Sequence, residues 1–359
     1  MRVITRRALI VLVLLAAVVA IVYLAGYLIM VKMPGKSYSG VLPPLTSNEM
    51  SLREELMRDV EKLAVGIGER NIWHYPNLTA AADFIEGSLA QAGYKVRRQS
   101  YEAEGKTCCN LEVEIKGLNL PEQIVIIGAH YDTVAGSPGA NDNASAVAAV
   151  LALGRRFARK GSARTLRFVL FANEEFPFFQ SEQMGSLVYA KACREKSENI
   201  IAMLSLETIG YYTEQPNSQT YPFPFSLYYP SIGNFLGFVS DLSSRKLLKK
   251  AIASFRKNCK FPCEGGAIPK SVPGIAWSDQ WSFWEQRYPA IMLTDTAPFR
   301  YPYYHTAEDT TDKLDFDSLA RVVTGIESVV KELVTLPNSK ARASAFAFAE
   351  GGGKDALKK

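Results

Sequence analysis

Mostly apolar runs alternate with amphipathic segments along the chain, and this alternation predicts strands and helices. Runs such as 123–129 (QIVIIGA) and 165–172 (TLRFVLFA) are typical of strands that are buried on both faces. Segments with apolar residues at helical spacing lie between such runs. The predicted strands cover 94–102, 109–116, 123–129, 165–172, 200–206 and 289–293. The predicted helices cover 47–63, 78–92, 144–159, 182–194, 245–256 and 316–336.

The order of these elements predicts the fold class. Strands that alternate with helices indicate an α/β fold, with a mixed, mostly parallel central sheet and helices on both of its faces. Ser47 or Asn48 is expected to cap the first helix of the body. Three tryptophans, Trp277, Trp281 and Trp284, recur at helical spacing and are expected to pack in the core.

The segment 8–31 differs from the other apolar runs because it contains no charged or amide side chain. As a helix that rises about 1.5 Å per residue, it reaches roughly 36 Å, enough to cross a hydrocarbon core of about 30 Å. A cleaved signal peptide is the competing interpretation, but its apolar stretch is usually only about 7–15 residues long. We therefore expect an uncleaved transmembrane helix that inserts residues 8–31 into a lipid bilayer.

Basic residues on both sides of this helix predict its orientation. Three arginines and the terminal amine precede it and two lysines follow it, which favours a cytoplasmic N-terminus. We expect a single-pass membrane protein with its folded body on the extracytoplasmic side. The predicted organisation is a cytoplasmic stub and anchor at 1–32, a linker rich in Pro, Gly and Ser at 33–46, a folded domain at 47–336 and a disordered tail at 337–359.

Composition places the chain among ordinary folded proteins, since 48% of its residues are hydrophobic and 21% are charged. The formal net charge of +5 comes entirely from residues 1–36, which carry five basic residues and no acidic residue, so the remainder is balanced. Nothing in this balance suggests the excess of positive charge that is typical of nucleic-acid binding. We expect no nucleic-acid partner.

Residues with chemical potential follow the carboxyl ends of the predicted strands, where open α/β sheets place their active sites. His130 and Asp132 follow one apolar strand in the sequence GAHYDT, and Glu174 and Glu175 follow the next in FANEEF. Glu207 ends the strand after that, in LETIGYY. Two adjacent carboxylates among apolar residues either lie in a solvated turn or need a cation to compensate them.

Asp142 in GANDNASA and His305 in YHTAEDT complete the set of candidate metal ligands. An aspartate at the start of a helix is also typical of an N-cap. Together with His130, Glu175 and Glu207, however, these residues form a set of imidazole and carboxylate ligands that suits Zn²⁺. Five ligands exceed the three that usually hold one catalytic zinc, so we expect two zinc ions per chain with one bridging carboxylate.

These motifs, in this order, resemble those of the co-catalytic zinc aminopeptidases, the superfamily of the secreted bacterial leucyl aminopeptidase and glutamate carboxypeptidase II. The resemblance covers about 60–336. It implies that one zinc is held by His130 and Glu207, that the other is held by Glu175 and His305, and that Asp142 bridges the two ions. Many members carry Asp at the position of Glu207, which is one methylene longer.

The resemblance also implies that Glu174 is the general base and that Asp132 supports the neighbouring histidine. Many members carry the sequence Ser-Asp-His at a position where this chain has Ser-Asp-Gln. Gln280 takes the place of that histidine, so any role of the histidine is lost. Some relatives place a tyrosine inside a small Cys-x-x-x-Cys loop to polarise the substrate carbonyl. Because Phe261 occupies that position here, Tyr304 is the expected replacement.

Three further features carry expectations of their own. Cys259 and Cys263 either close a small disulfide loop outside the cytoplasm or remain reduced in the core. The aromatic-rich segment 211–238 is expected to form the wall of a pocket for apolar side chains. His74 matches no ligand position and is expected at the surface or in a pocket wall.

These expectations describe a membrane-anchored, di-zinc exopeptidase, in which a zinc-dependent peptidase domain at 47–336 removes N-terminal residues from peptide substrates as an aminopeptidase. Two alternatives stay open. A glutaminyl cyclase-like enzyme would bind a single zinc, and the complete second ligand set argues against it. A non-enzymatic ectodomain of the transferrin-receptor type would have lost its metal site, and the retained ligands and Glu174 argue against that.

Overall fold

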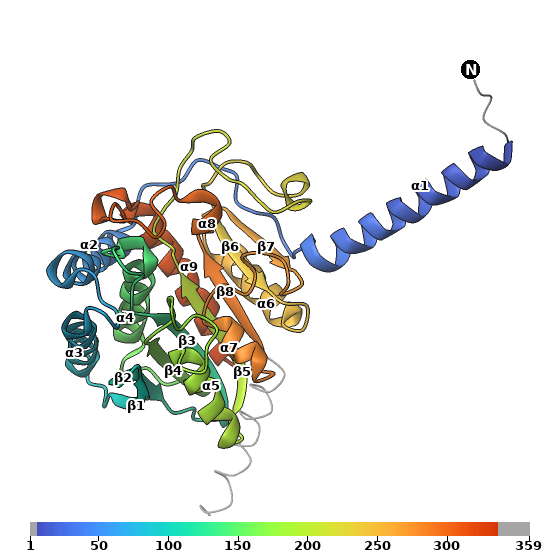
Figure 1. The fold of residues 1–359 in the computed structure, drawn as a ribbon. Helices are drawn as coiled ribbons and strands as arrows, with labels where there is room; N and C mark the ends of the chain where they lie inside the picture. The colour runs from blue at the N-terminus through green and yellow to red at the C-terminus, as the bar shows by residue number, and fades with distance from the viewer. Residues whose placement is uncertain (1–5, 337–359) are drawn as a thin grey trace, which may run out of the picture.

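The computed structural model describes residues 6–336, in which eight strands form one sheet with helices against both faces (Figure 1). The strands are β1 (Arg97–Ala103), β2 (Lys106–Ile115), β3 (Leu120–His130), β4 (Arg164–Phe171), β5 (Asn199–Glu207), β6 (Leu236–Ser240), β7 (Cys263–Ala267) and β8 (Ala290–Thr294). Their order across the sheet is β1-β2-β4-β3-β5-β8-β6-β7. Four of the seven pairings are parallel: β3–β4, β3–β5, β5–β8 and β6–β7. The predicted fold class is therefore confirmed.

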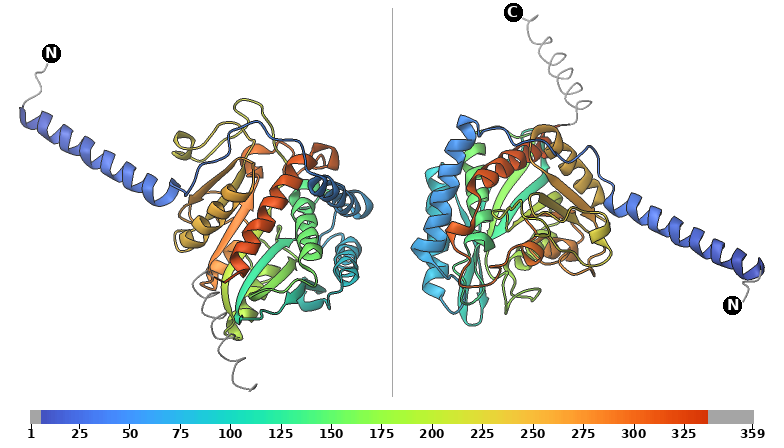
Figure 2. Two further views of the ribbon diagram at one scale, coloured as in Figure 1. Left: turned by 180° about the vertical axis from the view of Figure 1, so that it is seen from behind. Right: turned by 90° about the horizontal axis from the view of Figure 1, so that it is seen from above.

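The helices form a layer on each side of the sheet. α4, α6 and α9 lie side by side on one face, with α2 and α3 outside α4, whereas α5 and α7 cover the other face (Figure 2). The α-helices are α1 (Arg6–Gly26), α2 (Ser47–Glu61), α3 (Tyr75–Gln91), α4 (Ala146–Phe157), α5 (Gly185–Glu195), α6 (Arg245–Asn258), α7 (Gln280–Glu285), α8 (Ala297–Arg300) and α9 (Phe316–Val334). Short π- or 3₁₀-helical segments are η1 (Tyr27–Val31), η2 (Lys62–Ile67), η3 (Ala140–Ser145), η4 (Phe225–Leu227) and η5 (Thr311–Lys313).

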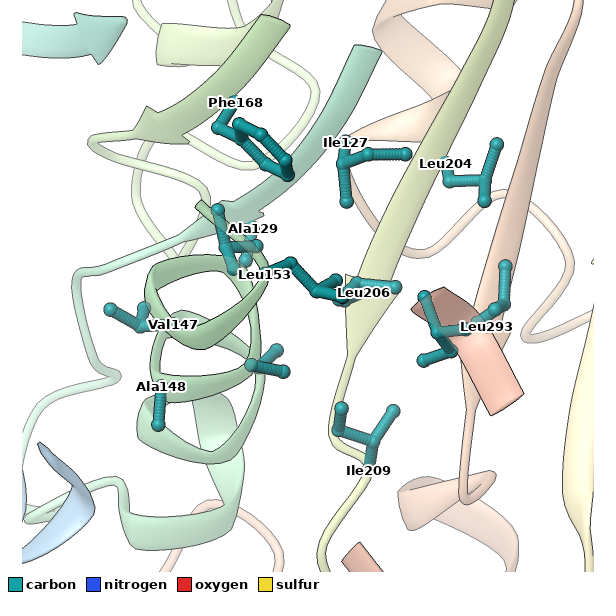
Figure 3. Close-up of a cluster of buried hydrophobic side chains, with 14 of the residues drawn as sticks. Ile127, Ala129, Val147, Ala148, Leu153, Phe168, Leu204, Leu206, Ile209 and Leu293 are labelled. Atoms are coloured by element: carbon teal, nitrogen blue, oxygen red, sulfur yellow. The ribbon is translucent and has the colours of Figure 1, made fainter. Parts of the chain in front are cut away.

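The core lies between α4 and the central strands. All eight residues of β4 are buried, as expected for a strand covered on both faces. Figure 3 shows Leu153 of α4 directed at β3 and β5, where it meets Ala129 and Leu206. These apolar residues pack α4 against the carboxyl ends of β3 and β5, and the candidate site lies at that edge.

The ends of several elements differ from the prediction for local reasons. Thr46, rather than Ser47 or Asn48, caps α2, because its side chain and that of Glu49 satisfy each other's backbone N–H groups in a capping box. α3 begins three residues earlier than predicted, with Pro76 in its first turn, a position that proline favours.

Strands β6 and β7 and the short helices α7 and α8 were not among the predicted elements. β6 and β7 are only five residues each, and β7 contains Gly265 and Gly266, so neither has a recognisable strand pattern. The three tryptophans at helical spacing were expected in the core, and α7 covers only Gln280–Glu285 of that stretch. Trp277 lies outside it and is 44% exposed, so its predicted place in the core is wrong, whereas Trp284 is buried.

The N-terminal region has two parts. α1 and η1 include a helix over Leu9–Val31 with mean hydropathy 3.0 that is long and apolar enough to cross a membrane. Segment 33–46 contains no helix or strand, yet Arg256 donates to the backbone carbonyl of Pro34 at 3.0 Å and Arg321 to that of Pro43 at 2.6 Å. The segment predicted as a linker is thus tied to the body. The predicted disordered tail lies outside the described residues.

Candidate metal centre

The candidate ligands meet at one edge of the sheet because they follow neighbouring strands. His130 and Glu207 are the last residues of β3 and β5, and Glu175 follows β4 by a short turn. β4, β3 and β5 are adjacent and parallel, so their carboxyl ends coincide. Asp142 comes from η3, just before α4, and His305 from the loop between α8 and α9. The structure therefore brings all five predicted ligands together.

The five ligands form two groups that share one residue. In the first group, Nε2 of His130 lies 3.3 Å from Oδ1 of Asp142 and 3.3 Å from Oε2 of Glu207. In the second group, Nε2 of His305 lies 3.0 Å from Oδ2 of Asp142 and 3.2 Å from Oε1 of Glu175. Each group has the compactness of a metal site. Asp142 thus directs one carboxylate oxygen into each group.

The hydrogen bonding of these atoms tests whether a metal fits. Within residues 6–336, both ring nitrogens of His130, both oxygens of Asp142 and Oε1 of Glu175 are buried and have no hydrogen-bond partner with acceptable geometry. Buried polar atoms are almost always paired, because an unpaired one costs about 1–3 kcal/mol. Imidazole nitrogens and carboxylate oxygens are also the ligands that zinc accepts. The site therefore fits divalent zinc, with His130 buried and His305 34% exposed at its mouth.

The charges of the cluster point the same way. Burial raises the pKa of Glu175 to about 7, with a further contribution from Asp142. Burial also raises the pKa of Glu174 and of Glu207. The pKa of His305 rises to about 10, because its contacts with Asp142 and Glu175 outweigh the opposing effect of burial. Several buried carboxyl groups this close together can all be ionised only if a positive charge offsets their repulsion. A divalent cation supplies that charge.

Asp132 ties the histidine-bearing strand to the turn that carries the two glutamates. Its Oδ1 accepts the backbone N–H of Glu174 at 3.0 Å, and its Oδ2 accepts that of Glu175 at 3.1 Å. Oδ1 also lies 3.4 Å from Nδ1 of His130. A carboxylate that orients a ligating imidazole in this way is a common feature of metal sites. Asp132 thereby orients residues in both groups.

Glu174 and Tyr304 lie beside the ligands without belonging to either group. Oε2 of Glu174 lies 3.9 Å from Nε2 of His130, while the side chain of the adjacent Glu175 reaches the other group. The ring of Tyr304 stacks on that of His305, with centroids 3.8 Å apart. Burial and the nearby carboxylates raise the pKa of the Tyr304 phenol well above its ordinary value, so it remains a hydrogen-bond donor at neutral pH.

Two buried residues that the sequence did not reveal hold the backbone of the Asp142 loop. Arg70 is fully buried and donates to the carbonyls of Tyr131 at 2.7 Å, Pro138 at 2.7 Å and Gly139 at 2.9 Å. Asp309 accepts the backbone N–H groups of Asn141 at 2.8 Å and Asp142 at 3.0 Å. Asp309 lies within the YHTAEDT stretch, which was its only signal, whereas Arg70 lies outside every motif.

In the stretch SDQWSFW, Ser278 supports the first ligand group, whereas Gln280, at the position of the family's histidine, makes its hydrogen bond elsewhere. Ser278 donates a 2.6 Å hydrogen bond to Oε2 of Glu207. Gln280 instead donates to the carbonyl of Ile275 at 3.0 Å. Asp279 is buried, and burial raises its pKa to about 7.

An apolar cavity adjoins the ligands. Its volume of about 100 Å³ is several times the roughly 10–15 Å³ that one water molecule needs, so it has room for a larger group. Glu207 and Tyr304 form part of its lining. Besides Tyr304, seven aromatic residues line it: Tyr221, Phe225, Tyr229, Phe235, Phe238, Trp277 and Phe299. Five of these seven come from the segment 211–238, which therefore lines a pocket as expected.

The remaining candidate residues lie elsewhere. Cys259 and Cys263 are not bonded to each other in the structure, and Phe261 between them is buried. His74 is exposed, and its Nδ1 lies 3.1 Å from Oε1 of Glu69, as expected for a surface residue.

Comparisons with known proteins agree with this geometry. The sequence model of Peptidase family M28 matches residues 110–330. The uncharacterized Escherichia coli (strain K12) protein YfbL is 34% identical over 285 residues, which cover 76% of this chain and 86% of YfbL. A probable leucine aminopeptidase of Arthroderma otae is 28% identical, covering 80% of this chain and 74% of that protein. The solved structure of BSAP, a zinc aminopeptidase from Bacillus subtilis, has a TM-score of 0.65 at 15% identity and covers 79% of this chain and 95% of BSAP.

The matched region includes both histidines and all the carboxylates of the candidate metal centre. It also covers more than half of the chain. The chain therefore belongs to peptidase family M28 and is a zinc metallopeptidase.

Proposed function

We propose that the protein is a membrane-anchored aminopeptidase with two zinc ions, which removes N-terminal residues from peptides. The observation that carries the proposal is the position of Asp142, whose two buried oxygens face separate ligand groups. One ion would be held by His130 and Glu207, and the other by Glu175 and His305. In such a site zinc supplies Lewis acidity toward the scissile carbonyl and the attacking water.

The protein's own residues would move the proton. Glu174 belongs to neither ligand group but lies beside the first, so its carboxylate is free to take a proton from the attacking water and return it to the leaving amine. The raised pKa of Glu174 agrees with a group that holds and releases a proton. The protonated phenol of Tyr304 would donate a hydrogen bond to the scissile carbonyl oxygen.

The apolar cavity supports action at a chain end. It begins at Glu207 and Tyr304, and apolar side chains surround it, so it suits the side chain of the residue to be removed. The free α-amino group of that residue would then lie among carboxylates, which favour a positive charge. The similarity to a probable leucine aminopeptidase supports the same preference.

The membrane part of the proposal rests on the apolar helix over Leu9–Val31. Arg6 and Arg7 precede it and Lys32 follows it. With the cytoplasmic end at the arginines, the body at 47–336 would work on the extracytoplasmic side.

Paired anilide substrates test the proposed activity. Leucyl-p-nitroanilide should be hydrolysed, while its N-acetylated form should react at least about 100-fold more slowly, because it lacks the charged amine. Equal rates on both would contradict aminopeptidase specificity while leaving a peptidase in place. Cyclisation of an N-terminal glutamine without anilide hydrolysis would instead identify a glutaminyl cyclase.

A further inference from the structure

The end of the apolar helix is held against the body by specific hydrogen bonds. The guanidinium of Arg245, in the first turn of α6, donates to the backbone carbonyl of Leu28 at 2.8 Å and to that of Ile29. Arg256, near the other end of α6, donates to the carbonyl of Pro34, which follows Ile29 by five residues. The body is therefore fixed in orientation relative to the last turns of the apolar helix.

One loop of the body reaches back along that helix. We call residues 221–229, which include η4, the aromatic loop. The ring of Tyr228 stacks on Tyr23 and Tyr27, with centroids 5.1 and 5.9 Å apart. Tyr23 precedes the end of the span at Val31 by eight residues, which is about 12 Å at 1.5 Å per residue. Figures 1 and 2 show this olive-yellow loop beside the end of α1 nearest the body.

The aromatic loop carries apolar side chains that the body leaves uncovered. Phe223 is 86% exposed and Leu227 is 63% exposed. Single exposed apolar residues are common on soluble proteins and need no explanation. These two, however, lie in the same loop as Tyr228, which contacts residues inside the candidate span, so a bilayer that contains the span would also reach the loop.

A basic group lies on the same side. α6 presents Arg245, Lys246 and Lys249 from its first turns, and Lys32 follows the apolar helix. Because Arg245 donates to the carbonyls of Leu28 and Ile29, the first turn of α6 lies against the last turn of the apolar helix and brings these basic residues to that end. Basic residues next to an inserted helix are attracted to anionic lipid headgroups.

We propose that the aromatic loop and the amino-terminal turns of α6 form a second membrane contact, in which Phe223 and Leu227 insert at the bilayer interface and Lys246 and Lys249 face anionic headgroups. This inference rests on the proposed anchor. Tyr221, Phe225 and Tyr229 of the same loop line the apolar cavity. The cavity is therefore separated from lipid by a single loop, which suits peptides with apolar N-termini that gather at the membrane surface.

Tryptophan quenching by lipid tests the contact in the full-length chain. The chain is reconstituted into phosphatidylcholine–phosphatidylglycerol vesicles with or without brominated acyl chains, which quench tryptophan on contact. Phe223→Trp is compared with Leu118→Trp, which places the same probe on a residue that is 77% exposed in the turn between β2 and β3. The end of the span, η1, packs against β7, and β2 lies near the opposite edge of the sheet. This control is therefore remote from the span.

We expect brominated lipid to remove at least half of the fluorescence that Phe223→Trp adds to the unsubstituted chain, and little of that added by Leu118→Trp. Equal quenching of both probes, or none, in chains that float with the vesicles would overturn the second contact and leave the anchor in place. A chain that does not float with vesicles would overturn the anchor and the contact together. Circular dichroism identical to that of the unsubstituted chain verifies folding of each variant.

Charge reversal tests the headgroup contact. Adding Lys246→Glu and Lys249→Glu to Phe223→Trp should weaken quenching at least twofold in vesicles with phosphatidylglycerol. In pure phosphatidylcholine vesicles the same change should have little effect. Quenching that is unaffected by charge reversal in both vesicle types would overturn the role of the two lysines.

Discussion

Replacing Asp132 by asparagine isolates the effect of a carboxylate that touches no metal in the proposed arrangement. Its two oxygens accept the N–H groups of Glu174 and Glu175 at 3.0 and 3.1 Å, and Oδ1 lies 3.4 Å from Nδ1 of His130. The asparagine keeps one acceptor oxygen, but its NH₂ group then opposes one of the two backbone donors. Asp132→Asn therefore loses one charge-assisted hydrogen bond and the negative charge beside the imidazole, while side-chain volume hardly changes.

The expected magnitude follows from these contacts. A hydrogen bond to a charged group contributes about 1.5–3 kcal/mol, and about 1.4 kcal/mol corresponds to a factor of ten in an equilibrium constant. Part of that loss should appear as weaker zinc binding, because the imidazole and the Glu175 ligand are both less well oriented. We expect zinc affinity to fall about 10- to 100-fold, the range typical of residues that orient metal ligands.

The assay is competition for zinc with a chelator of known affinity, measured together with kcat at saturating zinc. Asp83→Asn is the matched control. Asp83 is an exposed residue of α3 that pairs with Arg98, so this variant makes the same chemical change far from the site. The control should leave zinc affinity unchanged. Asp132→Asn with the zinc affinity and turnover of the unsubstituted protein would refute the orienting role.

Four further substitutions test other parts of the site. Glu174→Gln should retain zinc yet lower kcat by about 10²–10⁴-fold, whereas Glu175→Ala should lower zinc content as well; zinc loss in Glu174→Gln would mean that the two roles are exchanged. Arg70→Lys should lower the free energy of unfolding by about 3 kcal/mol in urea titrations, since a point ammonium cannot replace a planar fork bonded to buried carbonyls. Trp277→Ala should lower kcat/KM for leucyl anilide by about tenfold and for alanyl anilide by less, and equal losses would exclude a cavity contact.

Much of the fold was predictable because its signals are local. Buried parallel strands such as β4 are continuous apolar runs, and the helices between them show regular apolar spacing. β6 and β7 lacked such signals, because five residues are too few to show a pattern. β6 pairs with β8 and with β7, and such contacts between distant segments are not visible in the local sequence. Trp277 was misplaced because helical spacing alone does not show where a short helix begins.

The candidate site was predictable to a similar extent. Ligands that follow parallel strands must meet at one edge of the sheet, so His130, Glu175 and Glu207 were identifiable from their positions. The residues that hold the ligand-bearing loops were not. Arg70 and Asp309 act through backbone carbonyl and N–H groups, which every residue carries, and such contacts leave no pattern in a sequence.

The account's central claim is that two ions share Asp142, and anomalous diffraction at the zinc edge tests it most directly. Crystals of the zinc-loaded protein should show two peaks about 3.5–4 Å apart, one beside His130 and Glu207 and the other beside Glu175 and His305. The two peaks should lie on opposite sides of the Asp142 carboxylate. A single peak that persists at saturating zinc, with the second group of ligands empty, would contradict the account.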